Sequence, residues 1–321
     1  MDSVDTCKAY DKEVNSWEKL LNIAPSIGVC DKHPDYYTTH YLQKRKITTN
    51  KIQHHKAHVY SGMLDNQLSH PLLAISWDGT GLGDDQTLWG GEAFTVTENG
   101  MQRFATLFPF KLPGSEKAIR EPRRSALGIL HAIFGSNMPS NYKTWTADAF
   151  SNEELYALSK GINAPVCSSM GRLFDAVSAL LNCRLISHFE GDAALALEAL
   201  ANKAENVALR YTINFLKENG IWLLDWRTMV QQIFEDKMNH QPLSEIALAF
   251  HCALARAIME LACKASLENV LLTGGCMQNK LLAEKAIAQL KDAGFNPFWH
   301  HQIPPNDGGL AAGQIMGIKC V

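Results

Sequence analysis

Two histidines four residues apart, His54 and His58, are the first candidates for chemistry in this sequence. On a helix, residues at positions i and i+4 share one face, so their imidazoles can bind the same metal ion. His55 and Lys56, between them, would point elsewhere. A His pair of this kind is more often a surface pair or a satisfied core pair. The spacing therefore predicts a metal site only if other elements supply further ligands.

An aspartate, Asp78, directly follows the apolar run Leu73 to Trp77, which predicts a buried strand. Carboxylates at the carboxyl end of a strand lie where α/β sheets bind their ligands. The glycines that follow, Gly79, Gly81 and Gly83, would let backbone N–H groups approach an anion. The alternative is a plain hairpin start. The spacing is not a dinucleotide-binding fingerprint, because strands and not a helix follow it.

Two junctions of small residues precede predicted helices and are candidates for nucleotide contacts. In the first, Ser168 or Ser169 would cap a helix whose N-terminus favours phosphate, with Gly171 beside it. Asp175, about one turn further on, is placed to hold a pair of ribose hydroxyls. The second junction runs through Gly191. For both, the alternative is a capped helix with a surface aspartate.

A third turn joins a buried strand to a helix through Gly274 and Gly275. Two glycines there make a tight turn whose N–H groups can contact a nucleotide base or phosphate. Asn279 is the polar side chain expected to reach into the same site.

Asp307 lies in a Pro-Pro-Asn-Asp-Gly-Gly segment before the last predicted helix. It is the candidate for a fourth metal ligand beside His54, His58 and Asp78, and the alternative is a simple Asx turn. Two imidazoles and two carboxylates suit a divalent metal such as iron or zinc. The same three residues His54, His58 and Asp78 are the candidate catalytic group.

Composition limits the classes of protein that these candidates can belong to. The chain has 321 residues, 46% of them hydrophobic, which is enough for a sizeable core and for about two domains. Its 30 basic and 33 acidic residues nearly cancel, which argues against nucleic-acid binding by bulk charge. The eight cysteines are scattered without any Cys-x-x-Cys, which predicts a reducing, cytoplasmic location. The longest apolar stretch carries charged residues and predicts a core helix, not a membrane span.

The elements expected to position the candidates follow from hydrophobic periodicity and turn signals. The predicted fold class is α/β. Asn-Gly pairs at 99–100 and 219–220 predict two-residue hairpin turns with positive φ at both residues. Ser244 is the expected cap of a long helix. Predicted helices are 11–23, 36–46, 54–65, 243–267, 278–293 and 309–318, with mainly helical structure from 120 to 204; predicted strands are 27–30, 51–53, 73–77, 87–97, 101–110, 209–216, 221–224, 270–273 and one at 298.

Taken in order, these segments resemble one family. The motifs are His-His-Lys-Ala-His (54–58), Trp-Asp-Gly-Thr-Gly-Leu-Gly (77–83), Trp-Gly-Gly-Glu (89–92), Arg-Glu-Pro-Arg-Arg (120–124), Ser-Ser-Met-Gly-Arg-Leu-Phe-Asp-Ala-Val (168–177), Phe-Glu-Gly-Asp-Ala-Ala (189–194), Thr-Gly-Gly-Cys-Met-Gln-Asn (273–279) and Pro-Asn-Asp-Gly-Gly-Leu (305–310). The ordered set resembles the carboxy-terminal carbamoyltransferase region of the hydrogenase maturation proteins HypF, which is related to tRNA threonylcarbamoyl transferases. The resemblance covers nearly the whole chain.

The resemblance implies a two-lobed actin-like ATPase fold of the ribonuclease H-like type, with a metal and a nucleotide between its lobes. Residues 1–70 would form part of the first lobe, and residues 71–321 the second, with a helical insertion at about 120–205. By motif position, a divalent metal would be bound by His54, His58, Asp78 and Asp307. ATP, AMP or carbamoyl adenylate would contact residues in four of the motifs, namely Gly79, Gly81, Gly171, Asp175, Gly191, Gly274, Gly275 and Asn279.

The resemblance also implies a reaction. Carbamoyl adenylate would pass its carbamoyl group to the C-terminal cysteine thiol of a partner, HypE, on the route to the cyanide ligand of NiFe-hydrogenase. The alternatives are a small-molecule O-carbamoyltransferase with the same site, an inactive fragment that binds a nucleotide or a partner, and, as a weak fourth, a sugar-kinase-like enzyme. Nucleic acid and membrane are not expected partners.

Three departures from the family pattern bear on these expectations. The acylphosphatase domain, the zinc fingers and the YrdC-like adenylating domain that precede this region in the full-length family are not expected within the 321 residues. The first lobe is expected to be incomplete, because its opening strands would come before the first predicted helix. Lys56 stands where the family usually has a third histidine, which tests the view that this middle position is not a ligand.

Overall fold

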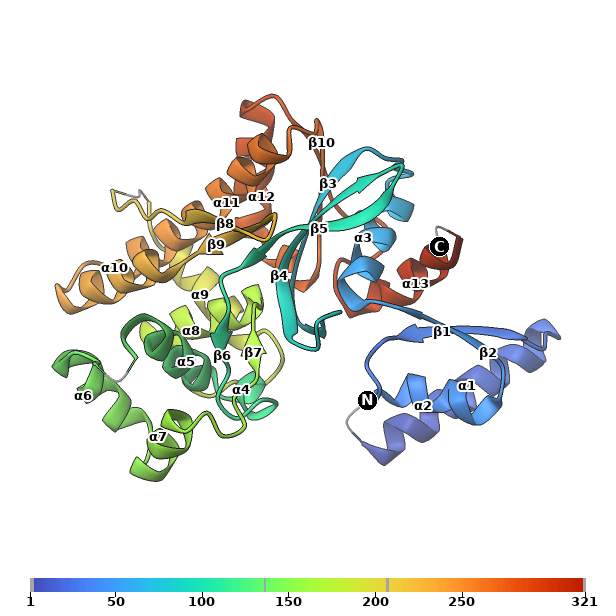
Figure 1. The fold of residues 1–321 in the computed structure, drawn as a ribbon, viewed down its shortest axis with the longest axis horizontal. Coiled ribbons are helices and arrows are strands. Elements are labelled where there is room, and N and C mark those ends of the chain that lie inside the picture. Colours follow the sequence, from blue (N-terminus) through green and yellow to red (C-terminus); the bar gives the residue numbers. More distant parts are fainter. Residues whose placement is uncertain (1–2, 136, 206–207, 320–321) are drawn as a thin grey trace.

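The computed structural model of the chain describes residues 3–135, 137–205 and 208–319. It has an N-terminal unit built on a small sheet and a larger part built on a nine-stranded sheet. Figure 1 shows the two side by side, with the small sheet next to α13. The elements of the N-terminal unit are α1 (Val4–Leu21), β1 (Ile27–Asp31), α2 (Tyr37–Arg45) and β2 (Thr48–Ile52). Helix α3 (His54–Asp65) follows and packs against the large sheet.

The large sheet has its strands in the order β11-β10-β3-β4-β5-β9-β8, with the short strand β7 paired to β4 and the short strand β6 paired to β7. β3, β4 and β5 are antiparallel, whereas β10 and β11 run parallel to β3. The strands are β3 (Leu72–Leu82), β4 (Leu88–Thr97), β5 (Gly100–Leu107), β6 (Phe110–Lys111), β7 (Val166–Cys167), β8 (Asn214–Glu218), β9 (Ile221–Asp225), β10 (Asn269–Thr273) and β11 (Asn296–Phe298).

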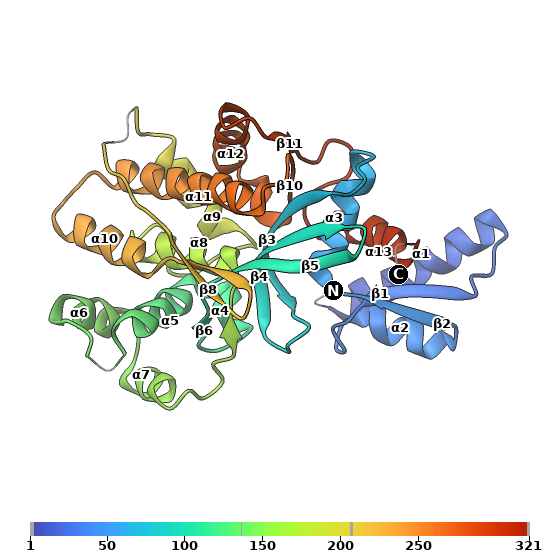
Figure 2. The ribbon, with the colours of Figure 1, turned by 45° about the horizontal axis from the view of Figure 1, so that its top comes forward.

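Helices cover both faces of this sheet, α3 and α13 on one face and α8 and α11 on the other, with α9 packed on α8 and α11 (Figures 1 and 2). The remaining elements are α4 (Lys117–Arg120), α5 (Pro122–Phe134), α6 (Ser140–Ala149), α7 (Asn152–Ser159), α8 (Met170–Leu180), α9 (Asp192–Ala201), α10 (Arg227–Met238), α11 (Leu243–Ala265), the 3₁₀ turn η1 (Gly275–Gln278), α12 (Lys280–Asp292), the 3₁₀ turn η2 (Asp307–Gly309) and α13 (Leu310–Lys319).

Strand β3 is buried on both faces, and the alternation of its side chains determines which of them face the candidate site. Leu73, Ile75 and Trp77 join the main core with α8 and α11. Leu72 and Ala74 join a second core with α3. Because side chains alternate along a strand, residues 76 and 78 also face α3. The apolar run that predicted a buried strand therefore also sets the direction of the carboxylate that follows it.

Helices α3 and α13 pack unusually closely. Glycine recurs every fourth residue at positions 309, 313 and 317, along one face of the segment that leads into and forms α13. A Cβ added at Gly313 would overlap the carbonyl oxygen of Ala57 in α3. Since α3 carries both candidate histidines, this contact is part of what holds the site.

Three expectations about local structure were wrong. The turn after β4 is formed by Glu98 and Asn99, because Thr97 pairs with Gly100, and Asn99 does not have a positive φ. Ser244 lies inside the first turn of α11, whose cap is Pro242. The strand expected at 209–216 begins only at Asn214. By contrast, the turn at 219–220 has positive φ at both residues, as predicted.

Helix α11 has the length and mean hydropathy of a membrane span, but 72% of its apolar window is buried inside the fold. This burial agrees with the core helix expected from the sequence.

Candidate metal and nucleotide site

Helix α3 supplies two imidazoles on one face. It begins at His54 because Gln53 caps it, accepting the N–H of Lys56 at 3.0 Å. The rings of His54 and His58 are 5.0 Å apart between centroids, and both side chains are fully buried. Lys56 points away and its Nζ lies 3.6 Å from Asp84, so the middle position of the motif is not in the cluster.

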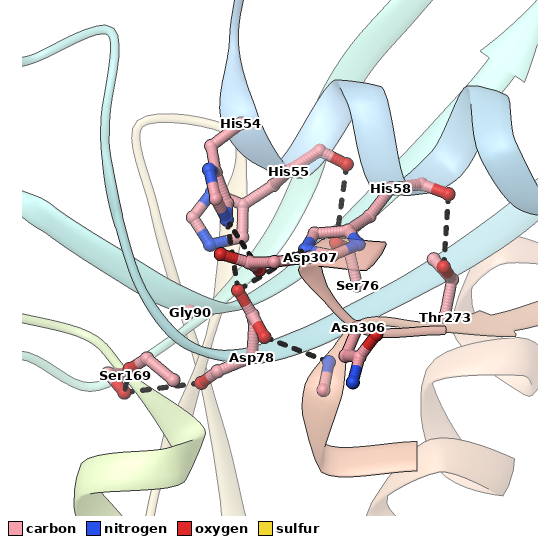
Figure 3. Close-up of polar contacts among 12 residues, drawn as sticks. His54, His55, His58, Ser76, Asp78, Gly90, Ser169, Thr273, Asn306 and Asp307 are labelled. Atoms are coloured by element: carbon pink, nitrogen blue, oxygen red, sulfur yellow. Dashed lines mark hydrogen bonds and ion pairs between the residues drawn. The ribbon is translucent and has the colours of Figure 1, made fainter. Parts of the chain in front are cut away.

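Two aspartates from distant segments complete the cluster, as Figure 3 shows. Oδ2 of Asp78 lies 3.2 Å from Nε2 of His54 and 3.3 Å from Nε2 of His58. Oδ1 of Asp307 lies 3.6 Å from both nitrogens. One ligand atom from each of the four residues falls within 4.8 Å of the others. The four residues expected to share a metal are therefore brought together.

The backbone around Asp78 explains how it reaches the cluster. The pairing of β3 with β4 is interrupted between Trp77 and Gly81, and such an irregularity re-aims a side chain. The N–H of Gly275 donates to Oδ1 of Asp78 at 2.8 Å, which leaves Oδ2 for the histidines. Gly81 is needed for space, because a Cβ there would lie 2.7 Å from the ring of His54.

The charges of the four residues stabilise one another. Burial alone would lower the pKa of His54, but the carboxylates of Asp307, Asp31 and Asp78 raise it well above its usual value. Burial opposes charge on Asp78 too, yet the two imidazoles hold its pKa well below the usual range. Two buried imidazoles facing two carboxylates are an arrangement in which a divalent cation can replace protons.

The first of the predicted nucleotide junctions lies directly beside the cluster. Ser169 caps α8 by accepting the N–H of Arg172 at 3.0 Å, and its hydroxyl also contacts the carbonyl oxygens of Asp78 and Gly79. A Cβ at Gly171 would lie 2.8 Å from Cα of Gly79, so the two segments touch backbone to backbone. A Cβ at Gly79 would meet nothing within 4 Å, so this glycine borders open space.

Asp175 lies within α8 and is 4% exposed. Its Oδ2 is 2.9 Å from Nη1 of Arg172, which is equally buried. Burial raises the pKa of Asp175 to about 6, and Arg172 only partly offsets this. The carboxylate is thus turned toward its own helix, and the ribose contact expected for it stays a prediction.

The raised pKa of Asp175 predicts a pH-dependent stability. A carboxyl with a higher pKa in the folded state stabilises the fold below its unfolded pKa and loses that contribution as pH rises to about 6. The full span is on the order of 3 kcal/mol. We expect the free energy of unfolding of the wild type, minus that of Asp175→Asn, to fall between pH 4.5 and pH 7 in urea titrations. Asp292→Asn, at an exposed position, is the control, and a difference independent of pH would contradict the assignment.

The other residues predicted to contact a nucleotide each have a different role in the fold. A Cβ at Gly274, where φ is +92°, would overlap the carbonyl oxygen of Trp77. Gly191 has φ +81° at the cap of α9. Asn279 caps α12, its Oδ1 accepting the N–H of Leu282 at 2.9 Å and its Nδ2 lying 3.1 Å from Nε2 of His251. With both ends of its amide in use, Asn279 has one N–H left for a ligand.

Two aspartates missed by sequence reasoning support the cluster. Asp31, at the end of β1, lies 2.8 Å from Nδ1 of His54. Asp65, at the end of α3, accepts the N–H groups of three successive residues that precede Asp307, at 2.5 to 3.3 Å. Asp31 follows a predicted strand, the same signal that singled out Asp78. Asp65 carries no comparable signal, since its partners lie more than 230 residues away.

Comparison with known families gives two matches along the chain. Residues 74–314 match the model described as carbamoyltransferase, Kae1-like domain, second subdomain. Residues 1–65 match the model described as HypF Kae1-like domain. The division into lobes at residue 70 stays a prediction.

Individual relatives agree. The chain is 34% identical to carbamoyltransferase HypF of Synechocystis sp., covering 98% of this chain and 43% of that protein. It is 32% identical to a HypF homolog of Cupriavidus necator, covering 96% and 81%. A crystal structure of full-length HypF in a phosphate- and nucleotide-bound form matches with a TM-score of 0.91 at 32% identity, over 99% of this chain and 42% of that one. The expected α/β fold of the actin-like ATPase class is thereby confirmed. The chain spans less than half the length of the Synechocystis relative.

Proposed function

This chain belongs to the HypF carbamoyltransferase family, and on that premise we propose that it transfers a carbamoyl group from carbamoyl adenylate to the C-terminal cysteine thiol of a HypE-like partner. The product would serve the synthesis of the cyanide ligand of NiFe-hydrogenase. The adenylate would come from acylphosphatase and YrdC-like adenylating domains like those of the longer family members. The cytoplasmic location expected from the cysteines stays a prediction.

The observation that carries this proposal is the convergence of His54, His58, Asp78 and Asp307 beside the small-residue junction of α8. Two buried imidazoles and two carboxylates are a donor set that fits iron or zinc. Nδ1 of His58 makes no hydrogen bond with the part of the chain that the structure describes, and Nε2 faces only the carboxylates of Asp78 and Asp307, which suits a ring held ready for a ligand. A bound divalent metal would polarise the carbamoyl oxygen as a Lewis acid.

Residues of the chain itself would bind the adenylate and leave access for the acceptor. Gly79 borders open space near the N-terminus of α8, and Gly171 lets the two backbones approach, so the adenylate phosphate would lie where N–H groups and the helix dipole favour an anion. The side chain of Asp307 is 70% exposed, so the cluster opens to solvent on that side and an acceptor can approach there. The thiolate sulfur would form a bond to the carbamoyl carbon while the bond from that carbon to the phosphate oxygen breaks. AMP leaves with the electron pair, and the thiol proton passes to solvent.

The proposal predicts metal-dependent release of AMP. Metal-loaded protein is mixed with carbamoyl adenylate and a HypE-like protein, and AMP and the thiocarbamate are measured by chromatography and mass spectrometry. We expect both products only when the C-terminal cysteine of the partner is present. The partner with that cysteine replaced by serine is the control. Folded, metal-loaded protein that yields no AMP with the intact partner would refute the proposed transfer.

A further inference from the structure

Asp31 connects the N-terminal unit to the cluster. It ends β1, whose partner β2 belongs to a two-stranded sheet separate from the large one. Its side chain is 3% exposed, and its Oδ2 lies 2.8 Å from Nδ1 of His54, which is 1% exposed. Nε2, the other nitrogen of that ring, faces Asp78 and Asp307. One imidazole is thus held between the small sheet on one side and the cluster on the other.

Both carboxylate oxygens of Asp31 have partners. Oδ1 accepts the N–H of His33 at 2.8 Å, so the carboxylate is fixed by the backbone that follows it. A carboxylate only accepts hydrogen bonds, so the ring of His54 must carry a proton on Nδ1. In the neutral ring, Nε2 then keeps its lone pair for a ligand. The ring of His58 lacks such a partner on Nδ1 among the described residues, so the two histidines are held differently.

We propose that Asp31 is a positioning residue of the metal site, which fixes the tautomer and the direction of His54. The inference rests on the metal site of the proposed function. Partners of this kind orient metal-bound histidines and raise the basicity of the ring. Asp31 also makes the site depend on the N-terminal unit, because β1 carries it. Lys32, next in the chain, strengthens that connection through its ion pair at 2.6 Å with Asp84, just beyond β3.

Asp31→Asn gives the sharpest test, because the N–H of His33 dictates how the amide must turn. The amide oxygen would stay on that N–H, and the NH₂ group would then face Nδ1 of His54. Two donors cannot share a hydrogen bond, so His54 would lose the proton on Nδ1 and carry it on Nε2 instead. That tautomer cannot bind a metal through Nε2. We therefore expect Asp31→Asn to weaken zinc binding about ten- to a hundredfold, and at least as much as Asp31→Ala does.

Zinc affinity is measured on the whole chain by competition with a chromophoric chelator, and the visible absorption of the Co²⁺-loaded protein reports the ligand geometry. Asp35→Asn, at an exposed position four residues further on, is the matched control and should bind zinc like the wild type. Far-UV circular dichroism checks folding, and Asp31→Ala provides a second variant should Asp31→Asn misfold.

The outcomes are distinguishable. Zinc affinities and Co²⁺ spectra of Asp31→Asn and Asp31→Ala that equal those of the wild type would overturn this inference alone. An Asn variant that binds like the wild type while only Ala is weakened would also overturn it, because a purely structural role predicts that order. A wild type that binds neither metal would overturn the metal site and this inference together.

Discussion

Gly313→Ala is expected to destabilise the protein by about 3 kcal/mol or more. The added Cβ would overlap the carbonyl oxygen of Ala57 and lie 2.7 Å from its carbonyl carbon and 2.9 Å from the backbone nitrogen of Ser61. These are backbone atoms inside α3, held by helical hydrogen bonds, so they cannot rotate aside. Relief requires α13 to move away from α3, which opens a packed interface. Urea unfolding should show the loss as a lower midpoint.

Two neighbours in α13 test whether the effect comes from this contact. Gly317→Ala would meet the ring of Tyr60 at 3.0 Å, a side chain that can shift by a few tenths of an ångström, so a smaller loss is expected. Gln314→Ala adds nothing toward α3 and should change the free energy of unfolding by about 0.5 kcal/mol or less. A midpoint for Gly313→Ala that matches that of Gln314→Ala would show that the helices are not packed as described.

Local sequence signals predicted most helices and strands, and they failed where long-range strand pairing determined the structure. Asn219-Gly220 forms the predicted turn because Glu218 pairs with Ile221 and leaves the dipeptide in the loop. The identical dipeptide at 99–100 does not, because the β4–β5 register places Gly100 in the ladder. The dipeptide states a local preference, whereas the register follows from which side chains of β4 must be buried.

Helix α1 shows that a local sequence pattern does not predict tertiary contacts. Its apolar residues recur at helical spacing and predict a helix at 11–23, whereas α1 runs from Val4 to Leu21; none of its residues is buried, and Trp17 is 57% exposed. Periodicity identifies a helix and its apolar face but carries no information about what that face contacts.

Some residues of the candidate site were likewise predicted from the sequence, and others were missed. The four cluster residues were predicted as a set only because single signals were combined with a family resemblance, since each alone was weak. Asp31 was missed although it follows a predicted strand, because its importance lies in a contact with His54, 23 residues later. Asn279 was predicted to reach a ligand, which stays a prediction: its Oδ1 caps α12 and its Nδ2 lies beside His251, so one N–H is left. Sequence marks the residue types, and only packing shows which of their atoms remain free.

Removing His54 should abolish metal binding. Four-ligand structural zinc sites gain about 10–16 kcal/mol in binding free energy, so one ligand accounts for about 2.5–4 kcal/mol, or roughly a hundredfold to a thousandfold in affinity. His54→Ala should exceed this, because the substitution leaves a buried cavity and deprives Asp31 of its partner. We expect purified His54→Ala to contain no metal above background by plasma mass spectrometry. Asp307→Ala should retain some, because a water molecule can replace a carboxylate that is 70% exposed.

Lower pH should weaken metal binding by the wild-type protein. The carboxylates raise the pKa of both His54 and His58, so protons compete with the metal up to a higher pH than for free histidine. Metal affinity should therefore rise with pH through the neutral range, with protons released on binding.

For the substitutions at the ligands, His40→Ala, which removes an exposed imidazole from α2, is the control and should leave metal content unchanged. Metal content that is the same in His54→Ala, Asp307→Ala and the wild type would refute the ligand assignment, whatever the fate of carbamoyl transfer.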